Sequence, residues 1–199
     1  MRGSFRRAGV LADGAGFFLA VPDYVDVEKL QLETIDNLTL PAVRAALDPT
    51  ITGLDSRAFL ETALEVVMTA DGYGLEAAGY RLTKNTTDEF NNAILDGYHS
   101  KRDFVYPSFS PSVWDNMPHH VLTDPKGIEG PSNTVYTLAH IDFSLGTFGD
   151  TVLSRATPGV AAISEMDSAV NLGGLNASAA VTQWVEKNRE TYDGWFRPL

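Results

Sequence analysis

The segment that most constrains the fold is residues 98–157, because the helical spacing of apolar residues that precedes it stops there. Two stretches within it, FVYPSFSPSVWDNMPHH and DPKGIEGPSN, hold five of the ten prolines. Proline fixes φ and lacks an amide proton, so it interrupts helices and central strands. Apolar and polar residues then alternate through TVYTLAHIDFSLGTFG, residues 134–149, as they do in a half-buried strand. We therefore expect long loops and one long strand here, which excludes an all-helical fold.

Apolar residues recur at helical spacing on both sides of this segment. The strongest pattern is DSRAFLETALEVVMTADG, and TTDEFNNAILDG opens with Thr86 and Glu89 at the spacing of a capping box. Weaker strand patterns occur in GVLADGAGFFLAV and GLEAAGYRL. The sequence thus predicts an α+β fold, with helices in the N-terminal half and at the C-terminus around a small, mostly antiparallel sheet with long loops. The predicted helices cover 24–48 in two pieces, 55–72, 86–97 and 158–190 with a break at Gly173.

Three of these helical patterns end in the same way, with aspartate, glycine and an aromatic residue. The glycines are Gly72, Gly97 and Gly194. Glycine just past a helix can adopt positive φ and close the last turn, and the aromatic ring can then pack back on that turn. We interpret the repeated signature as helix termination rather than as a ligand-binding motif.

At 199 residues the chain has the length of one domain. We expect residues 1–23 to form an N-terminal arm or edge strand and residues 24–199 to form a single α+β domain, which contains the long loop and strand region 98–157. The chain has no cysteine, which excludes disulfides, thiolate metal sites and cysteine nucleophiles. This composition fits a reducing compartment.

The net charge of -11 excludes the usual electrostatic route to nucleic acid, which needs a basic surface. Basic residues gather at the start, where Arg2, Arg6 and Arg7 form a short cationic arm on an acidic body. Such an arm can bind an acidic neighbour, including another copy of the chain, or it can simply solubilise the N-terminus. No apolar run reaches the ~18 residues of a membrane span, and the opening residues lack a clear signal-peptide cleavage site. We expect a cytoplasmic protein or part of an assembled particle, without membrane or nucleic-acid partners.

The four histidines are the remaining candidates for chemistry, because the chain has no nucleophile elbow, P-loop, dinucleotide, zinc-protease or calcium-loop motif. His140 and Asp142 are two residues apart in the predicted strand, so their side chains project from the same face. His120 directly follows His119, so only one of these two can join a site on extended backbone, and His99 can add a third imidazole. Together His140, Asp142, His120 and His99 are candidate ligands for one divalent transition metal ion. The competing interpretation is structural, with solvated loop histidines and a strand histidine hydrogen-bonded within the sheet.

Two functions from different classes fit these features. The first is a non-catalytic structural or assembly subunit of a larger homo- or hetero-oligomer, for example a virus or phage particle component. It would have no cofactor, and its partners would be other protein subunits, including its own copies. Long loops without regular structure support this hypothesis, because such loops are usually functional or held by neighbours. The alternative is a metal-dependent enzyme of hydrolase or oxygenase type, centred on His140 and Asp142, with Trp114 or Tyr106 in the substrate wall. We favour the assembly subunit.

Overall fold

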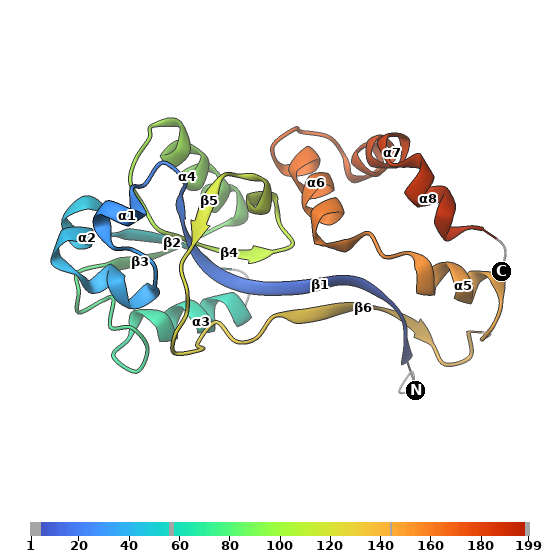
Figure 1. Cartoon of the computed structure of the whole chain (residues 1–199), viewed down its shortest axis with the longest axis horizontal. Helices are drawn as coiled ribbons and strands as arrows, with labels where there is room; N and C mark the ends of the chain where they lie inside the picture. Colours follow the sequence, from blue (N-terminus) through green and yellow to red (C-terminus); the bar gives the residue numbers. More distant parts are fainter. Residues whose placement is uncertain (1–4, 56–57, 144, 198–199) are drawn as a thin grey trace. The chain divides into compact units, whose positions relative to one another are not determined.

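A computed structural model describes residues 5–55, 58–143 and 145–197 of the chain. The described residues form an α+β fold, as predicted, with eight α-helices and a small, mainly antiparallel sheet (Figure 1). The strands are β1 (Phe5–Pro22), β2 (Thr50–Leu54), β3 (Arg81–Asn85), β4 (Tyr106–Ser110), β5 (His119–Val121) and β6 (Asn133–His140). The helices are α1 (Val27–Leu30), α2 (Pro41–Ala46), α3 (Ala58–Met68), α4 (Thr87–His99), α5 (Phe148–Arg155), α6 (Gly159–Asn171), α7 (Ala177–Lys187) and α8 (Arg189–Trp195), with short 3-10 helices η1 (Ile35–Thr39) and η2 (Val113–Asn116).

β1 is the strand that organises the main sheet. It pairs antiparallel with β6 along its first part, where Phe5 lies opposite His140, and with β5 near its end, where Val21 lies opposite His120. It also pairs with β4. β2 and β3 form a separate parallel pair, against which α3 and α4 pack. The strand predicted over 134–149 is shorter than expected, because β6 ends at His140 and the chain then turns.

The chain divides into two compact units. Unit 1 comprises Met1–Gly16, Ser110–Asn116 and Ser132–Leu199, and unit 2 comprises Phe17–Phe109 and Met117–Pro131. The boundary that the sequence suggested, after residue 23, does not coincide with any of these limits. The expected arm and single domain stay a prediction about domain organisation.

Unit 2 contains the main hydrophobic core. β1 contributes Phe17, Leu19 and Val21, alternate residues that face the same side of the strand. Ile51 of β2 and Val67 of α3 are fully buried in the same cluster. Burial of each such side chain stabilises the fold by about 1.5–3 kcal/mol. The helical and strand patterns of the sequence therefore converge on one core in this unit.

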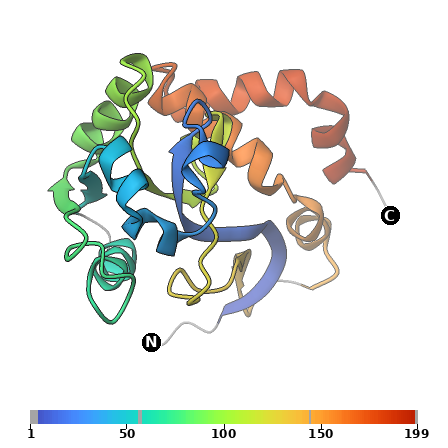
Figure 2. The same ribbon diagram turned by 60° about the vertical axis from the view of Figure 1, so that its left-hand side comes forward.

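Unit 1 is held together by polar contacts between η2 and α6. The Asp115 carboxylate accepts a hydrogen bond from the Ser164 hydroxyl at 2.6 Å and from the Ser112 amide at 3.0 Å. The Asp167 carboxylate accepts one from the Val113 amide at 2.7 Å. α6 packs in turn against α7, and α7 against α8, so these helices are linked in series (Figure 2). Two carboxylates thus fix η2 to the C-terminal helices.

Thr86→Ala is expected to destabilise unit 2 by about 1 kcal/mol, because it removes the N-cap of α4. The capping box predicted from the sequence is present: the Glu89 amide donates to the Thr86 hydroxyl at 3.4 Å, and the Glu89 carboxylate accepts from the Thr86 amide at 2.9 Å. The Thr86 amide and the Thr86 hydroxyl both donate to the Glu89 carboxylate, and they lower the pKa of that carboxyl. Urea denaturation measures the effect. Thr87→Ala, at an exposed threonine in the same turn, is the control and should change stability by only a few tenths of a kcal/mol; equal losses from both substitutions would contradict the capping role.

Candidate ligand-binding pocket

His140 and Asp142, the centre of the metal hypothesis, do lie together in unit 1. The Nδ1 atom of His140 is 3.3 Å from an Asp142 carboxylate oxygen, and it also lies 3.3 Å from the Asp142 amide nitrogen. The sequence predicted that both residues would lie on one face of a strand. Instead β6 ends at His140, and the turn that follows brings Asp142 next to the imidazole. The Phe5 ring packs edge-on against the imidazole, with 5.8 Å between the ring centres. Both partners of this pair are exposed to solvent.

The other two predicted ligands belong to unit 2. His99 is the last residue of α4, and His120 lies on β5 with its Nε2 atom 3.3 Å from the Asp23 carbonyl oxygen. Over the described parts of the chain, no three histidine, cysteine, aspartate or glutamate residues form a group that could hold a metal ion. The metal ligand set stays a prediction, which metal analysis of the purified chain would test.

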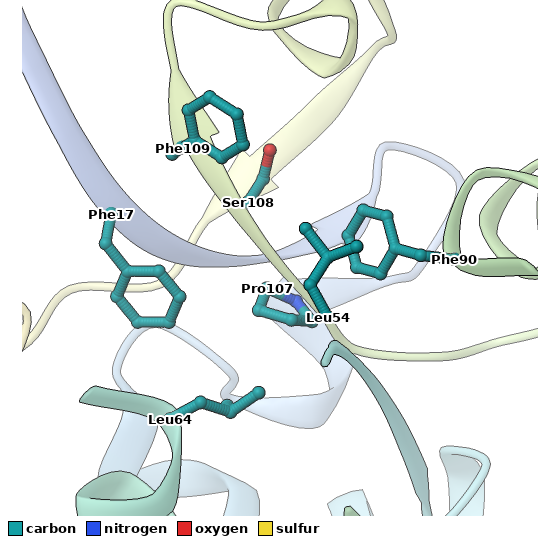
Figure 3. Close-up of a pocket in the computed structure, with 7 residues that line it drawn as sticks. All are labelled: Phe17, Leu54, Leu64, Phe90, Pro107, Ser108 and Phe109. Carbon is teal, nitrogen blue, oxygen red and sulfur yellow. The ribbon is translucent and has the colours of Figure 1, made fainter. Parts of the chain in front are cut away.

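A small apolar pocket lies within unit 2, outside all of these predicted residues. The space between its lining side chains, together with the open solvent at its mouth, is about 260 Å³. Five of its seven lining residues are buried, and Ser108 contributes a hydroxyl to an otherwise apolar lining. In the view of Figure 3 the rings of Phe17 and Phe90 lie on opposite sides of Pro107. The pocket is lined by Phe17, Leu54, Leu64, Phe90, Pro107, Ser108 and Phe109.

The pocket forms where five elements of unit 2 meet at the carboxyl end of β2. Leu54 is the last residue of that strand, and ligands of open α/β sheets commonly bind beyond the carboxyl ends of their strands. Gly53 permits this packing, because a Cβ atom there would lie 3.0 Å from Leu64 and 2.9 Å from Leu82. The remaining lining residues come from β1, α4 and β4. Strand and helix packing therefore hold the three phenylalanines in place.

The lining indicates what kind of group the pocket can accept. Apolar pockets with a single polar group favour small ligands with an apolar portion and one oriented hydrogen bond. Phenylalanine rings also present negatively polarised faces, which attract cations such as quaternary ammonium groups. The lining residues include no acid, base or nucleophile of the kind that catalysis requires beyond the Ser108 hydroxyl. The pocket is thus suited to binding.

The sequence hypotheses placed Trp114 and Tyr106 in a substrate wall, and the structure gives them other positions. Tyr106 is fully buried, and its hydroxyl lies 2.9 Å from that of Tyr98. Trp114 is 2% exposed and belongs to unit 1. Among the aromatic residues of the proline-rich segment, the one that lines the pocket is Phe109, three residues after Tyr106. No sequence spacing connected Phe109 with Phe17, so the sequence analysis did not find the pocket.

A small pocket with aromatic walls is a candidate ligand-binding site in this fold. Residues 4–187 match the family model described as the substrate binding domain of ABC-type glycine betaine transport system. Because this match covers nearly the whole chain, the protein belongs to that family. A comparison with curated protein sequences gave no match.

Solved structures share the fold at low sequence identity. Lactococcal OpuAC, in its closed-liganded conformation with glycine betaine, matches with a TM-score of 0.71 and 20% identity over 97% of this chain and 71% of its own. The glycine betaine/L-proline-binding protein ProX from Borrelia burgdorferi matches with a TM-score of 0.69 and 20% identity over 96% and 69%. An ABC-transporter choline binding protein in complex with choline gives a TM-score of 0.68 and 15% identity over 96% and 66%. The chain thus spans only 66% to 71% of the length of these three proteins.

Family membership corrects the functional predictions made from the sequence. The chain is not a virus or phage particle component or a structural assembly subunit, and it is not a metal-dependent enzyme of hydrolase or oxygenase type. The predicted self-association with other copies is likewise wrong, because the family binds small ligands within a transport system. The long loops that suggested assembly contribute instead to the units: the segment after α4 supplies β4 and part of the pocket.

The expectation of no membrane span agrees with the structure. Among the helices formed by the described residues, none is long and apolar enough to cross a membrane. The predicted location in an assembled particle has no support, because the family belongs to a transport system.

Proposed function

We propose that this chain binds a small organic cation with a quaternary ammonium group, as the substrate-binding part of an ABC-type transport system. The observation that carries the proposal is the pocket of three phenylalanines in a member of a glycine betaine transport family. The ligands named for two proteins of similar fold, glycine betaine and choline, both contain a trimethylammonium group. Binding of this kind requires no cofactor.

The pocket supplies the interactions that such a cation needs. A quaternary ammonium cannot donate a strong hydrogen bond, so its recognition depends on aromatic faces and on burial of its methyl groups. Each ring face contributes about 0.5–2 kcal/mol, and most when water is excluded. The burial of Phe17 and Phe90 keeps water from that part of the lining. The net charge of -11 also attracts a cation towards the protein.

The proposed role places the chain outside the cytoplasm, beside the membrane permease of its transport system. This location replaces the cytoplasmic one expected from the sequence, and its support is the family to which the chain belongs. On the same proposal, the chain contacts the permease and delivers its ligand to it for transport into the cell.

Titration calorimetry with glycine betaine, choline and 3,3-dimethyl-1-butanol tests the proposal. The last compound has the shape of choline but carries no charge, so it should bind at least about tenfold more weakly than choline if ring faces attract the cation. Phe17→Leu and Phe109→Leu keep an apolar side chain but remove a ring, and each should weaken binding about tenfold.

Phe18→Leu is the matched control, because Phe18 neighbours Phe17 on β1 but stacks on His119 instead of lining the pocket. Its affinity should stay within about twofold of the original chain. Failure of both trimethylammonium compounds to bind, or equal affinity in all three leucine variants, would show that this pocket is not the site.

A further inference from the structure

A second pocket lies within unit 1, between α6 and α7. A short turn over residues 172–176 joins these two helices, which pack against each other. Each helix contributes one stripe of residues to the lining, because positions three and four apart lie on the same face of a helix. The space between the lining side chains, together with the open solvent at its mouth, is about 290 Å³. This α6–α7 pocket is lined by Glu165, Met166, Ala169, Ala180, Gln183 and Trp184.

The buried side of the α6–α7 pocket is apolar. Ala180 is 2% exposed and Trp184 is 7% exposed. The Trp195 ring of α8 stacks on the Trp184 ring with 5.9 Å between the ring centres, and the Tyr192 ring lies 5.8 Å from that of Trp195. This stacking holds the Trp184 indole in place. The pocket therefore offers an apolar group a surface that is present before a ligand binds.

The polar side of the pocket consists of Glu165 and Gln183. The Glu165 side chain is 44% exposed, and its carboxylate accepts a hydrogen bond from the Lys187 ammonium at 2.5 Å. Lys187 lies outside the lining, and its side chain is 67% exposed. Ion pairs between exposed side chains contribute little to stability, because water screens both charges. A ligand can therefore take the place of Lys187 on Glu165 at small cost.

We propose that the α6–α7 pocket binds a small primary ammonium ion, whose alkyl part packs on Trp184 and whose N–H groups donate to Glu165. The bond from Lys187 shows that this carboxylate accepts such a donor. Hydrogen bonds between a charged donor and a carboxylate are stronger than those between neutral groups. The side-chain carbonyl oxygen of Gln183 is a second acceptor in the lining. An anionic ligand would meet the Glu165 charge on a chain whose net charge is -11.

This class of ligand differs from the one proposed for the phenylalanine pocket of unit 2. A quaternary ammonium has no N–H group, so it cannot donate a hydrogen bond to Glu165. A primary ammonium needs acceptors in place of its water, and the phenylalanine rings of unit 2 supply none. The two pockets are therefore expected to select different cations.

NMR titration of the chain with n-butylammonium tests the proposal. The indole N–H signal of Trp184, assigned with Trp184→Phe, reports on the α6–α7 pocket, and its shift should saturate. 1-Butanol has nearly the same shape but no charge, while tetramethylammonium has the charge but no N–H donor. Each of these two should bind at least about tenfold more weakly than n-butylammonium.

Three substitutions test the role of the carboxylate. Glu165→Gln keeps the shape of the side chain and removes its charge, so n-butylammonium should bind about tenfold more weakly. Glu186→Gln, at an exposed carboxylate of α7 outside the lining, is the matched control and should keep the affinity within about twofold. Lys187→Ala removes the internal competitor for Glu165, so it should strengthen binding about threefold. A purely structural role of Glu165 predicts no such gain.

Ala169→Leu tests the cavity itself, because the larger side chain fills it without changing any charge. It should abolish the saturable shift of the Trp184 signal. If this variant alters the circular dichroism of the chain, Gln183→Phe, at an exposed position of the lining, replaces it and should have the same effect.

The proposal fails if n-butylammonium gives no saturable shift at Trp184, or if 1-butanol binds as tightly. It also fails if Glu165→Gln and Glu186→Gln weaken binding equally, which would indicate only the general attraction of an acidic chain for cations. Weaker binding in Lys187→Ala would contradict the exchange of ammonium groups on Glu165. None of these measurements involves the phenylalanine pocket, so the outcome is separate from that of the binding proposal for unit 2.

Discussion

Gly72→Ala is expected to lower the free energy of unfolding of unit 2 by about 3 kcal/mol, at the upper end of the usual cost of overpacking. After α3 the chain folds back across the last turn of the helix, and the Tyr73 amide donates to the Val67 carbonyl oxygen at 3.0 Å. A Cβ atom on Gly72 would lie 1.9 Å from the Val66 carbonyl oxygen and 3.0 Å from the Val67 Cα atom. These are backbone atoms, which cannot move aside as a flexible side chain can. The substitution must therefore displace the helix end.

Urea denaturation of unit 2, followed by hydrogen exchange of α3, measures this loss. Gly194→Ala is the matched control, because Gly194 lies in α8 and a Cβ atom there would have no neighbour within 4 Å. Alanine exceeds glycine in helix propensity by about 1 kcal/mol, so the control should be neutral or slightly stabilising. A Gly72→Ala variant as stable as the original chain would show that the helix end adapts to the methyl group.

The three glycines that follow helical patterns show which structural features local sequence patterns can predict. The spacing predicted α3, α4 and α7, and it missed α8 as a separate helix. It interpreted Gly72, Gly97 and Gly194 as helix terminators that can adopt positive φ, and none of the three has that conformation. α4 and α8 continue through their glycines. Gly97 is needed because the Phe104 ring lies where its Cβ atom would be, at 2.5 Å. These close contacts depend on how the chain folds back after each helix, which helical spacing does not show. The sequence analysis therefore identified Gly72 and Gly97 as important for the wrong reason.

Local sequence patterns also could not predict the pocket of unit 2. The alternation through 134–149 predicted a strand and brought His140 and Asp142 together, but it did not show that β6 ends at His140. β2 was missed altogether, because TITGL has five residues and lies between two helical patterns. Phe17, Phe90 and Phe109 are far apart in the chain, and each fits the buried side of its own element. Only the packing of β1, α4 and β4 makes them one pocket.

The segment that joins β5 to β6 contains two acidic residues, Glu129 and Asp124, whose hydrogen bonds no sequence motif predicted. The Glu129 carboxylate accepts a hydrogen bond from the Leu19 amide of β1 at 2.8 Å, and the Glu129 amide donates to the Asp124 carboxylate at 2.6 Å. The Tyr73 hydroxyl donates to the other oxygen of Asp124, and it accepts from the Lys126 amide at 2.8 Å. Burial and the hydrogen bond to Asp124 raise the pKa of the Tyr73 hydroxyl. The segment is thus tied to the core of unit 2 through acidic side chains.

Burial raises the pKa of the Glu129 carboxyl from 4.5 to about 7, and the negative charge of Asp124 acts in the same direction, while the Leu19 amide opposes both. Because the folded state holds this proton more tightly than the unfolded state, the contribution of Glu129 to stability is fully present below about pH 4.5. It is lost as the pH rises through about 7. The whole shift would correspond to more than 3 kcal/mol, and solvent screening of this partly exposed group reduces the expected loss to about 2 kcal/mol.

Glu129→Gln is therefore expected to stabilise unit 2 by about 2 kcal/mol at pH 8 and to leave it nearly unchanged at pH 4.5. The glutamine carbonyl oxygen can still accept from the Leu19 amide, so the variant removes the ionisation and keeps the hydrogen bond. Urea denaturation at several pH values between 4 and 8 measures the difference, and subtracting the two curves cancels the titration of all other groups. Glu28→Gln, at an exposed position of α1, controls for the loss of one negative charge. If Glu129→Gln gives a constant difference, the carboxyl is not held neutral by burial, and the link between β1 and this segment is insensitive to pH.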